Sequence, residues 1–146
     1  MRDKGIMENF FRRDGRLNRL RYFKRVLVIN LIMIIIFTAI FIFSPGSSLD
    51  DISPAENMWL NIIDLILFVP WFCLMTRRLH DMNKNETLAW VVVALEVLTL
   101  NSSLSDPLFA VENIPDLIQL LILFYMFLIP GTKGRNKYGA DPLGQH

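Results

Sequence analysis

The sequence predicts an all-α polytopic membrane protein with four transmembrane helices, because long apolar segments alternate with segments that differ in basic charge. Of its 146 residues, 53% are hydrophobic and 20% are charged. This composition excludes a disordered chain, and the length fits one membrane domain over residues 1–146. The lone Cys73 lies inside an apolar segment, so we expect neither a disulfide-stabilised fold nor a thiolate metal cluster.

Four apolar segments are expected to form helices within the membrane. They cover residues 26–43, 58–75, 88–103 and 115–129. The first has 18 residues without a charge, which corresponds to about 27 Å of helix. The last has 15 residues, or about 22 Å, against a hydrocarbon core of about 30 Å. Because the last two segments are short, a re-entrant pair is the alternative to two complete crossings.

The distribution of Lys and Arg predicts the orientation of the chain. Nine of the 15 basic residues lie in residues 1–25, three in 76–87 and three in 130–146, whereas 44–57 and 104–114 contain none. Basic residues are retained on the cytoplasmic side of short loops. We therefore expect four crossings with both termini in the cytoplasm, and the re-entrant alternative fits the same distribution.

The basic segment 1–25 is expected to contain an interfacial helix ahead of the first span. Arg12, Arg16 and Arg19 recur at helical spacing. Aromatic anchors accompany them: Phe10, Phe11, Tyr22 and Phe23. We expect these arginines to fix the orientation and to bind anionic phospholipid headgroups, at about 1 kcal/mol each. The alternative is that Arg16 and Arg19 belong to a specific anion or partner site.

Three sequence motifs lie on the predicted cytoplasmic side. They are GRLNRLRYF at 15–23, RRLHD at 77–81 and PGTKGRNKYGADP at 130–142. In this order they resemble the bacterial inner-membrane family known as domain of unknown function 805, the YhaH/YhaI-like proteins. The resemblance covers nearly the whole chain and implies a multi-pass protein of the bacterial inner membrane, without an assigned reaction. The family usually has Gly-Trp at the start of the third span, whereas this chain has Trp90 about one turn later.

These motifs are expected to form one polar cap on the cytoplasmic face. Glycines in the 130–146 tail allow it to fold back on the membrane surface. We expect His80 and Asp81 to pair with Arg16, Arg19 or Asp141 rather than to act in catalysis or bind a metal, since a nucleophile or a second histidine is not nearby. The predicted cap comprises Arg16, Arg19, Arg77, Arg78, His80, Asp81, Asn136, Tyr138 and Asp141.

Asp64 and Glu96 are the acidic residues within the second and third predicted spans. A carboxylate at a helix centre raises the free energy of membrane insertion by about 2.5 to 3.5 kcal/mol. Measured from the cytoplasmic ends of their spans, they lie about 16 Å and about 14 Å deep, so they are expected at a similar depth on adjacent helices. Asn61, one turn from Asp64, would complete a proton or cation site. The alternative is that both carboxyls are protonated and hold the helices together by hydrogen bonds.

From the sequence we expect a non-enzymatic protein without a cofactor or metal, which acts as an interaction or lipid-contacting module through the polar cap. Its expected partners are the lipid bilayer, anionic phospholipid headgroups, and a second copy or another membrane protein, but no nucleic acid. The alternative function is a small oligomeric proton or cation channel, or a transporter subunit, that uses Asp64 and Glu96. An intramembrane enzyme comes third, because no known catalytic motif is present.

Overall fold

The computed structural model describes residues 5–43, 54–99 and 109–144. Within these ranges the regular structure is helical, with one isolated bridge between Asn136 and Gly139. The helices are α1 (Ile6–Phe10), α2 (Arg19–Phe43), α3 (Pro54–Asp81), α4 (Thr87–Thr99) and α5 (Phe109–Leu128). The all-α prediction is therefore confirmed for the described part of the chain.

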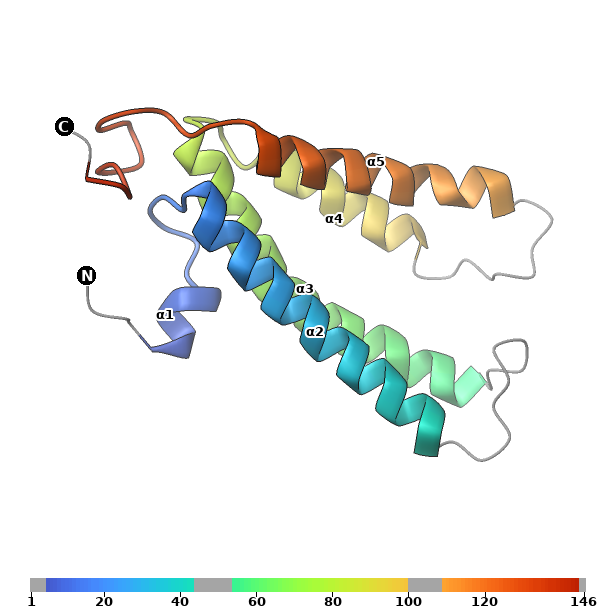
Figure 1. The fold of residues 1–146 in the computed structure, drawn as a ribbon. Helices are drawn as coiled ribbons and strands as arrows, with labels where there is room; N and C mark the ends of the chain where they lie inside the picture. The colour runs from blue at the N-terminus through green and yellow to red at the C-terminus, as the bar shows by residue number, and fades with distance from the viewer. Residues whose placement is uncertain (1–4, 44–53, 100–108, 145–146) are drawn as a thin grey trace.

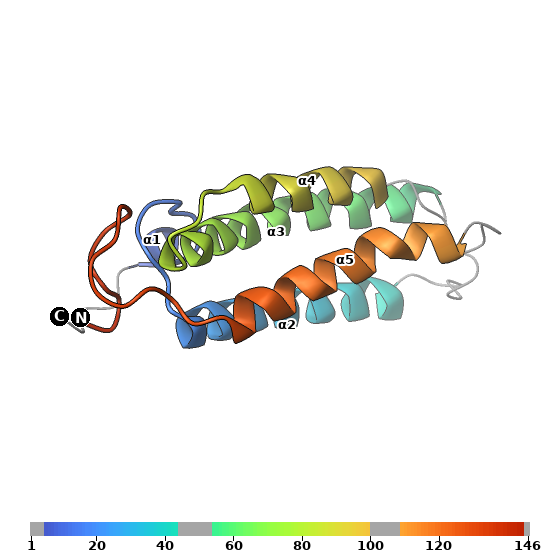
Figure 2. The same cartoon turned by 90° about the horizontal axis from the view of Figure 1, so that it is seen from above.

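The four longer helices form two antiparallel pairs. α2 packs against α3 and α4 packs against α5 (Figure 1). The two pairs lie close together at one end of the molecule and diverge toward the other (Figure 1). In the view from above, all four helices extend in a common direction away from α1 and the 129–144 segment (Figure 2). We call the end that holds α1 and this segment the cap end.

The packed core lies near the cap end, and the remaining helix surface is largely apolar and exposed. Buried core residues are Leu17, Tyr22, Val26, Ile29, Leu74, Met75, Leu79, Met82, Ala89, Val92 and Met126. Farther along the helices, Ile35 and Ile66 are 66% and 63% exposed. Exposed apolar faces of this extent are unusual in soluble monomers and typical of helices that contact lipid.

Two of the helices, α2 and α3, are long and apolar enough to cross a membrane. Only 11% of the apolar window of α2 and 22% of that of α3 are buried within the chain, unlike the core helix of a soluble protein. The 13 residues of α4 span about 20 Å and the 20 residues of α5 about 30 Å. The described apolar parts of these two helices, Thr87–Val97 and Leu117–Leu128, are shorter than a segment that crosses a membrane by itself.

Several predicted boundaries differ from the structure. α2 begins at Arg19 rather than Val26, and α5 begins at Phe109, so that Pro115 lies inside the helix rather than at its start. The predicted third span ended at residue 103, and its last four positions lie outside the described residues.

The predicted helix through Arg12, Arg16 and Arg19 is wrong. α1 ends at Phe10, and Arg12 and Arg16 lie in the irregular 11–18 segment. Within that segment Gly15 has φ of 85°, a conformation that a right-handed helix excludes. α2 then starts with an N-cap, since the Asn18 side chain accepts a hydrogen bond from the backbone N–H of Arg21 at 2.9 Å.

Candidate functional site

Asp81, at the C-terminal end of α3, accepts hydrogen bonds from two buried arginines. Arg16 Nε lies 3.1 Å from Oδ1, and Arg78 Nη1 lies 2.5 Å from Oδ2. The three side chains are only 1%, 0% and 4% exposed for Arg16, Arg78 and Asp81. Charges removed from water require close partners, and each guanidinium here also has backbone acceptors. We refer to Arg16, Arg78 and Asp81 as the buried charge cluster.

Arg16 joins the N-terminal segment to the C-terminal tail. Its Nη1 donates to the carbonyl oxygen of Gly134 and lies 3.4 Å from that of Gly139, and its Nη2 donates to the carbonyl oxygen of Thr132. These carbonyls belong to the turn-rich tail after α5, in which the Gly139 carbonyl also accepts from Asn136 N at 3.0 Å. The guanidinium therefore organises the tail, because its donors satisfy backbone groups that would otherwise need water.

Arg78 joins α3 to the end of α5. Its Nε donates to the carbonyl oxygen of Met126 at 2.9 Å, and its Nη2 donates to that of Ile129. The last carbonyls of a helix have no partner within the helix and carry the negative end of its dipole. Arg78 therefore caps α5 from a neighbouring helix.

The 130–142 motif is fastened to the end of α3 by further polar contacts. The His80 ring stacks on Tyr138, with centroids 3.8 Å apart and planes 10° from parallel. Asn136 Nδ2 donates to the His80 carbonyl at 2.9 Å, and Thr132 donates to the Asp81 carbonyl through its backbone N–H and its hydroxyl. Asp141 accepts hydrogen bonds from the backbone of the tail itself, at Gly134 N and Leu143 N.

The other two predicted cap residues lie at the edge of this arrangement. Arg77 points toward α1, where Nη1 lies 3.2 Å from the Asn9 carbonyl oxygen, and its own carbonyl accepts from Leu17 N. Arg19 is exposed at the first position of α2, outside the buried charge cluster. The structure thus brings every predicted cap residue to the cap end, with Arg19 at its surface.

Gly131 has a packing role that the sequence analysis did not predict. A Cβ atom built on Gly131 would lie 2.6 Å from Asp81 Cγ and would overlap the carboxylate. The backbone of the tail can approach the buried charge cluster this closely only without a side chain. The Pro-Gly pair after α5 therefore has a packing role beyond ending the helix.

A second contact that the sequence did not predict joins the 11–18 segment to the start of α4. Arg13 Nη2 lies 2.5 Å from Glu86 Oε2, and this hydrogen bond holds the pKa of the Glu86 carboxyl below its usual range. Arg13 also lies over the ring of Phe72, 5.5 Å from its centroid, and Trp90 packs against the same ring. Trp90 therefore packs at the cap end, one turn after the position where Gly-Trp is missing.

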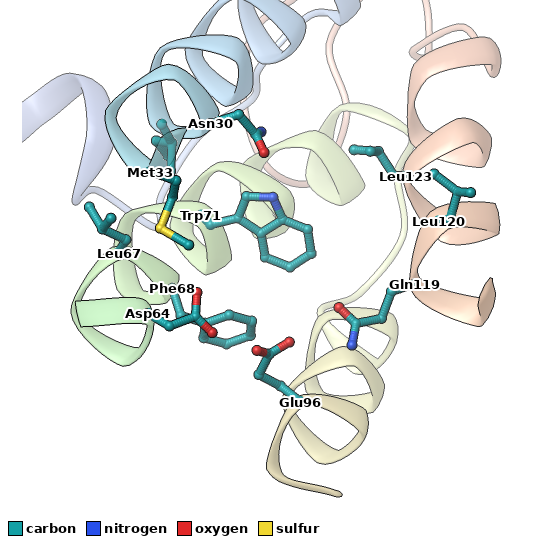
Figure 3. Close-up of a pocket in the computed structure, with 11 residues that line it drawn as sticks. Asn30, Met33, Asp64, Leu67, Phe68, Trp71, Glu96, Gln119, Leu120 and Leu123 are labelled. Atoms are coloured by element: carbon teal, nitrogen blue, oxygen red, sulfur yellow. The ribbon is translucent and has the colours of Figure 1, made fainter. Parts of the chain in front are cut away.

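The polar residues predicted within the membrane are only partly brought together. A cavity of about 360 Å³ lies between the two helix pairs, and Asp64 of α3 and Glu96 of α4 both project into it (Figure 3). Gln119 of α5 and Asn30 of α2 complete its polar lining (Figure 3). Asn61, one turn before Asp64 on α3, is not among the residues that line this cavity. Among the described residues, no three His, Cys, Asp or Glu side chains gather as metal ligands.

Comparison with known proteins places the chain by its sequence alone. No curated protein and no solved structure matches it. A family model described as "Protein of unknown function (DUF805)" matches residues 10–140, a range that includes the buried charge cluster and nearly all of the 130–142 motif. Since the match covers most of its length, the chain belongs to the DUF805 family of proteins of unknown function.

Proposed function

We propose that this chain is an integral protein of the bacterial inner membrane, in which α2 to α5 cross the bilayer with both termini in the cytoplasm. The exposed apolar faces of the helices support this placement, as does the gathering of basic residues at the cap end. A re-entrant pair formed by α4 and α5 is the alternative, because α4 has only 13 helical residues.

The proposed function is non-enzymatic: the cap end contacts anionic phospholipid headgroups and holds the helices in a fixed arrangement for a partner in the membrane. The observation that supports this proposal is that two arginines of the cap end are buried and bonded within the protein, whereas others are exposed on its surface. Arg16 and Arg78 are buried and committed to Asp81 and to backbone carbonyls. Arg12, Arg19 and Arg21 are exposed around them. Such exposed cations at a membrane surface attract anionic lipid.

The test is thermal unfolding of the purified protein in nanodiscs of phosphatidylcholine alone or with added phosphatidylglycerol. We expect a higher melting temperature with phosphatidylglycerol, and we expect salt to reduce the increase, because the interacting charges are exposed. The double variant Arg12→Gln/Arg19→Gln should lose much of the increase. Equal melting temperatures of the wild-type protein in the two lipid mixtures would contradict headgroup contact.

A second candidate function is supported by the cavity between the helix pairs. Asp64 and Glu96 lie on different helices and share one cavity with Gln119 and Asn30 (Figure 3). Carboxylates with amide neighbours suit a proton or a cation, and ionisable groups within membrane spans often mark ion pathways. In this candidate, several copies assemble and Asp64 and Glu96 line the conducting route.

A further inference from the structure

A second polar cavity lies at the cap end, between α1, the 11–18 segment, the start of α2, the end of α3 and the tail. Its volume is about 290 Å³. The arginines that line it are Arg12, Arg16, Arg21, Arg25 and Arg77. The carboxylates that line it are Glu8, Asp14 and Asp141. These elements meet where Figure 1 shows α1 beside the first turns of α2.

Among the described residues that line this cavity, five are arginines and three are carboxylates. Arg16 donates to Asp81, and Asp141 accepts from backbone N–H groups of the tail. Arg25 donates through Nη2 to the Asn9 side chain at 2.6 Å. Several arginines around one cavity create a positive potential that attracts an anion, even where some of them also have protein partners.

Arg77 lies among the other arginines of this cavity. Arg25, Arg12 and Arg21 lie near enough to repel its guanidinium charge. Nη1 donates to the carbonyls of Asn9 and Glu8, which fixes the side chain against α1. Its Nε is buried and has no hydrogen-bond partner among the described residues. Buried donors of charged groups nearly always have an acceptor. A fixed guanidinium with an unused N–H can therefore donate to an anionic ligand.

We propose that this cavity is a binding site for a phosphate group, with Arg12, Arg21, Arg25 and Arg77 as its ligands. Arginines that converge from a loop and two helices supply many N–H donors around one point, which suits an anion with several charged oxygens. Asp14 and Glu8, which also line the cavity, would disfavour binding of a more extended polyanion such as nucleic acid.

The position of the site suits a phosphate held at the membrane surface. Arg21 and Arg25 lie on the first two turns of α2, immediately before its apolar stretch. On α1, Ile6 and Met7 are 75% and 70% exposed, and apolar side chains of this kind enter the headgroup region. The phosphate of an anionic lipid headgroup and that of a soluble phosphate ester have the same chemistry here. The inference rests on the proposed membrane placement and gives its headgroup contact a defined site.

The experiment separates the two sources. In one arm, the protein in phosphatidylcholine nanodiscs is titrated calorimetrically with inorganic phosphate and glycerol 3-phosphate at constant ionic strength. In the other arm, native mass spectrometry counts phosphatidylglycerol retained from mixed nanodiscs. Each arm compares the wild-type protein with Arg12→Gln, Arg77→Gln and the matched control Arg135→Gln, which removes the same charge from an exposed position of the tail outside the cavity.

We expect binding in at least one arm, weakened by about tenfold or more in Arg12→Gln and Arg77→Gln and unchanged in Arg135→Gln. Because Arg12 is exposed in an irregular segment, its variant reports on binding even if Arg77→Gln fails to fold. Binding in the first arm identifies a soluble phosphate, and binding confined to the second identifies the lipid headgroup. Equal weakening in all three variants would overturn the site while leaving headgroup contact intact, and absence of binding in both arms would overturn the site.

Discussion

The carboxylate of Asp81 lies between the guanidinium groups of Arg16 and Arg78, so the buried charge cluster contains two cations and one anion. The arrangement is tolerated because carbonyl oxygens from the tail and from the end of α5 accept the remaining N–H groups. Asp81 is therefore the position at which a change of charge has the largest expected effect on stability.

Asp81→Asn should lower the free energy of unfolding by about 3 to 5 kcal/mol, because it leaves two buried cations without their anion while preserving the shape of the side chain. Asp14→Asn is the matched control, since it makes the same chemical change at an exposed position. The measurement is denaturant or thermal unfolding in detergent. Equal midpoints for the two variants would show that Asp81 is not coupled to the arginines.

Gly131→Ala should also destabilise the protein, by about 1 to 3 kcal/mol, because its methyl group would overlap the Asp81 carboxylate and force the tail outward. Gly5→Ala is the control, since a Cβ there meets nothing within 4 Å and Gly5 has φ of −53°. Thermal unfolding of the two variants should differ clearly. A Gly131→Ala protein as stable as Gly5→Ala would show that the tail does not pack closely on Asp81.

At the scale of elements, the ends of the helices decide how the cap end is built. Two residues after the end of α3, Asn83 has φ of 58°, and Lys84 N–H donates to the Leu79 carbonyl at 2.9 Å. This is a left-handed helix end, a conformation that asparagine tolerates better than most residues. The turn directs the chain from α3 into α4 and leaves the polar end of α3 facing the tail.

The helices were predictable because uncharged apolar segments leave few alternatives, whereas their ends were not. Hydropathy predicts that the first span starts at Val26, because the preceding residues include several arginines. Helix α2 nevertheless begins at Arg19, since arginine is a good helix former. The sequence predicts a helix start at Pro115, but α5 begins at Phe109 and accommodates Pro115 in its second turn. The α4 to α5 connection lies outside the described residues, so the prediction for its position was not tested.

The cap residues were predictable as a group, because charge alternation placed three motifs on one side of the membrane. Their individual partners were not. Arg16 and Arg78 bind mainly backbone carbonyls, and a carbonyl leaves no signal in the sequence. The number of residues between each carboxylate and the cytoplasmic end of its helix predicts that Asp64 and Glu96 lie at a similar depth. Gln119 was not predicted, because burying an amide in an apolar segment costs less free energy than burying a carboxylate and gives a weaker signal in the sequence.

At the scale of the whole molecule, the two helix pairs meet at the cap end and separate beyond it (Figure 1). Packing is concentrated at the meeting point, and the cavity with Asp64 and Glu96 lies where the pairs begin to part. Polar contacts and packing hold the helices together at the cap end. Farther along, the apolar surfaces are exposed and available to lipid or to other protein chains.

The proposed four-crossing arrangement predicts the accessibility of single cysteines in a Cys73→Ser background. Ser48→Cys and Ser105→Cys should react with a membrane-impermeant maleimide in intact cells, whereas Lys84→Cys and Lys137→Cys should react only after permeabilisation. Labelling of Lys137→Cys in intact cells would contradict four crossings. Protection of Ser105→Cys alone would favour the re-entrant pair.

The second candidate function predicts ion flux from purified protein reconstituted in liposomes. Asp64→Asn and Glu96→Gln should each abolish flux of protons or monovalent cations while leaving the melting temperature close to that of the wild type, because both side chains project into the cavity rather than into the core. Asn61→Leu is the control, since Asn61 does not line the cavity. Flux that persists in both carboxylate variants would exclude this route.

The contacts of Arg16 also set the order in which the protein can be completed during synthesis. Its acceptors at Thr132 and Gly134 follow it by 116 and 118 positions, so all of α2 to α5 must be synthesised before these carbonyls exist. Contacts between such distant segments form late, because the connecting chain must first be ordered. A nascent chain that contains α2 and α3 but not yet the tail therefore holds an incomplete charge cluster, and the tail completes the cluster when it closes over Arg16.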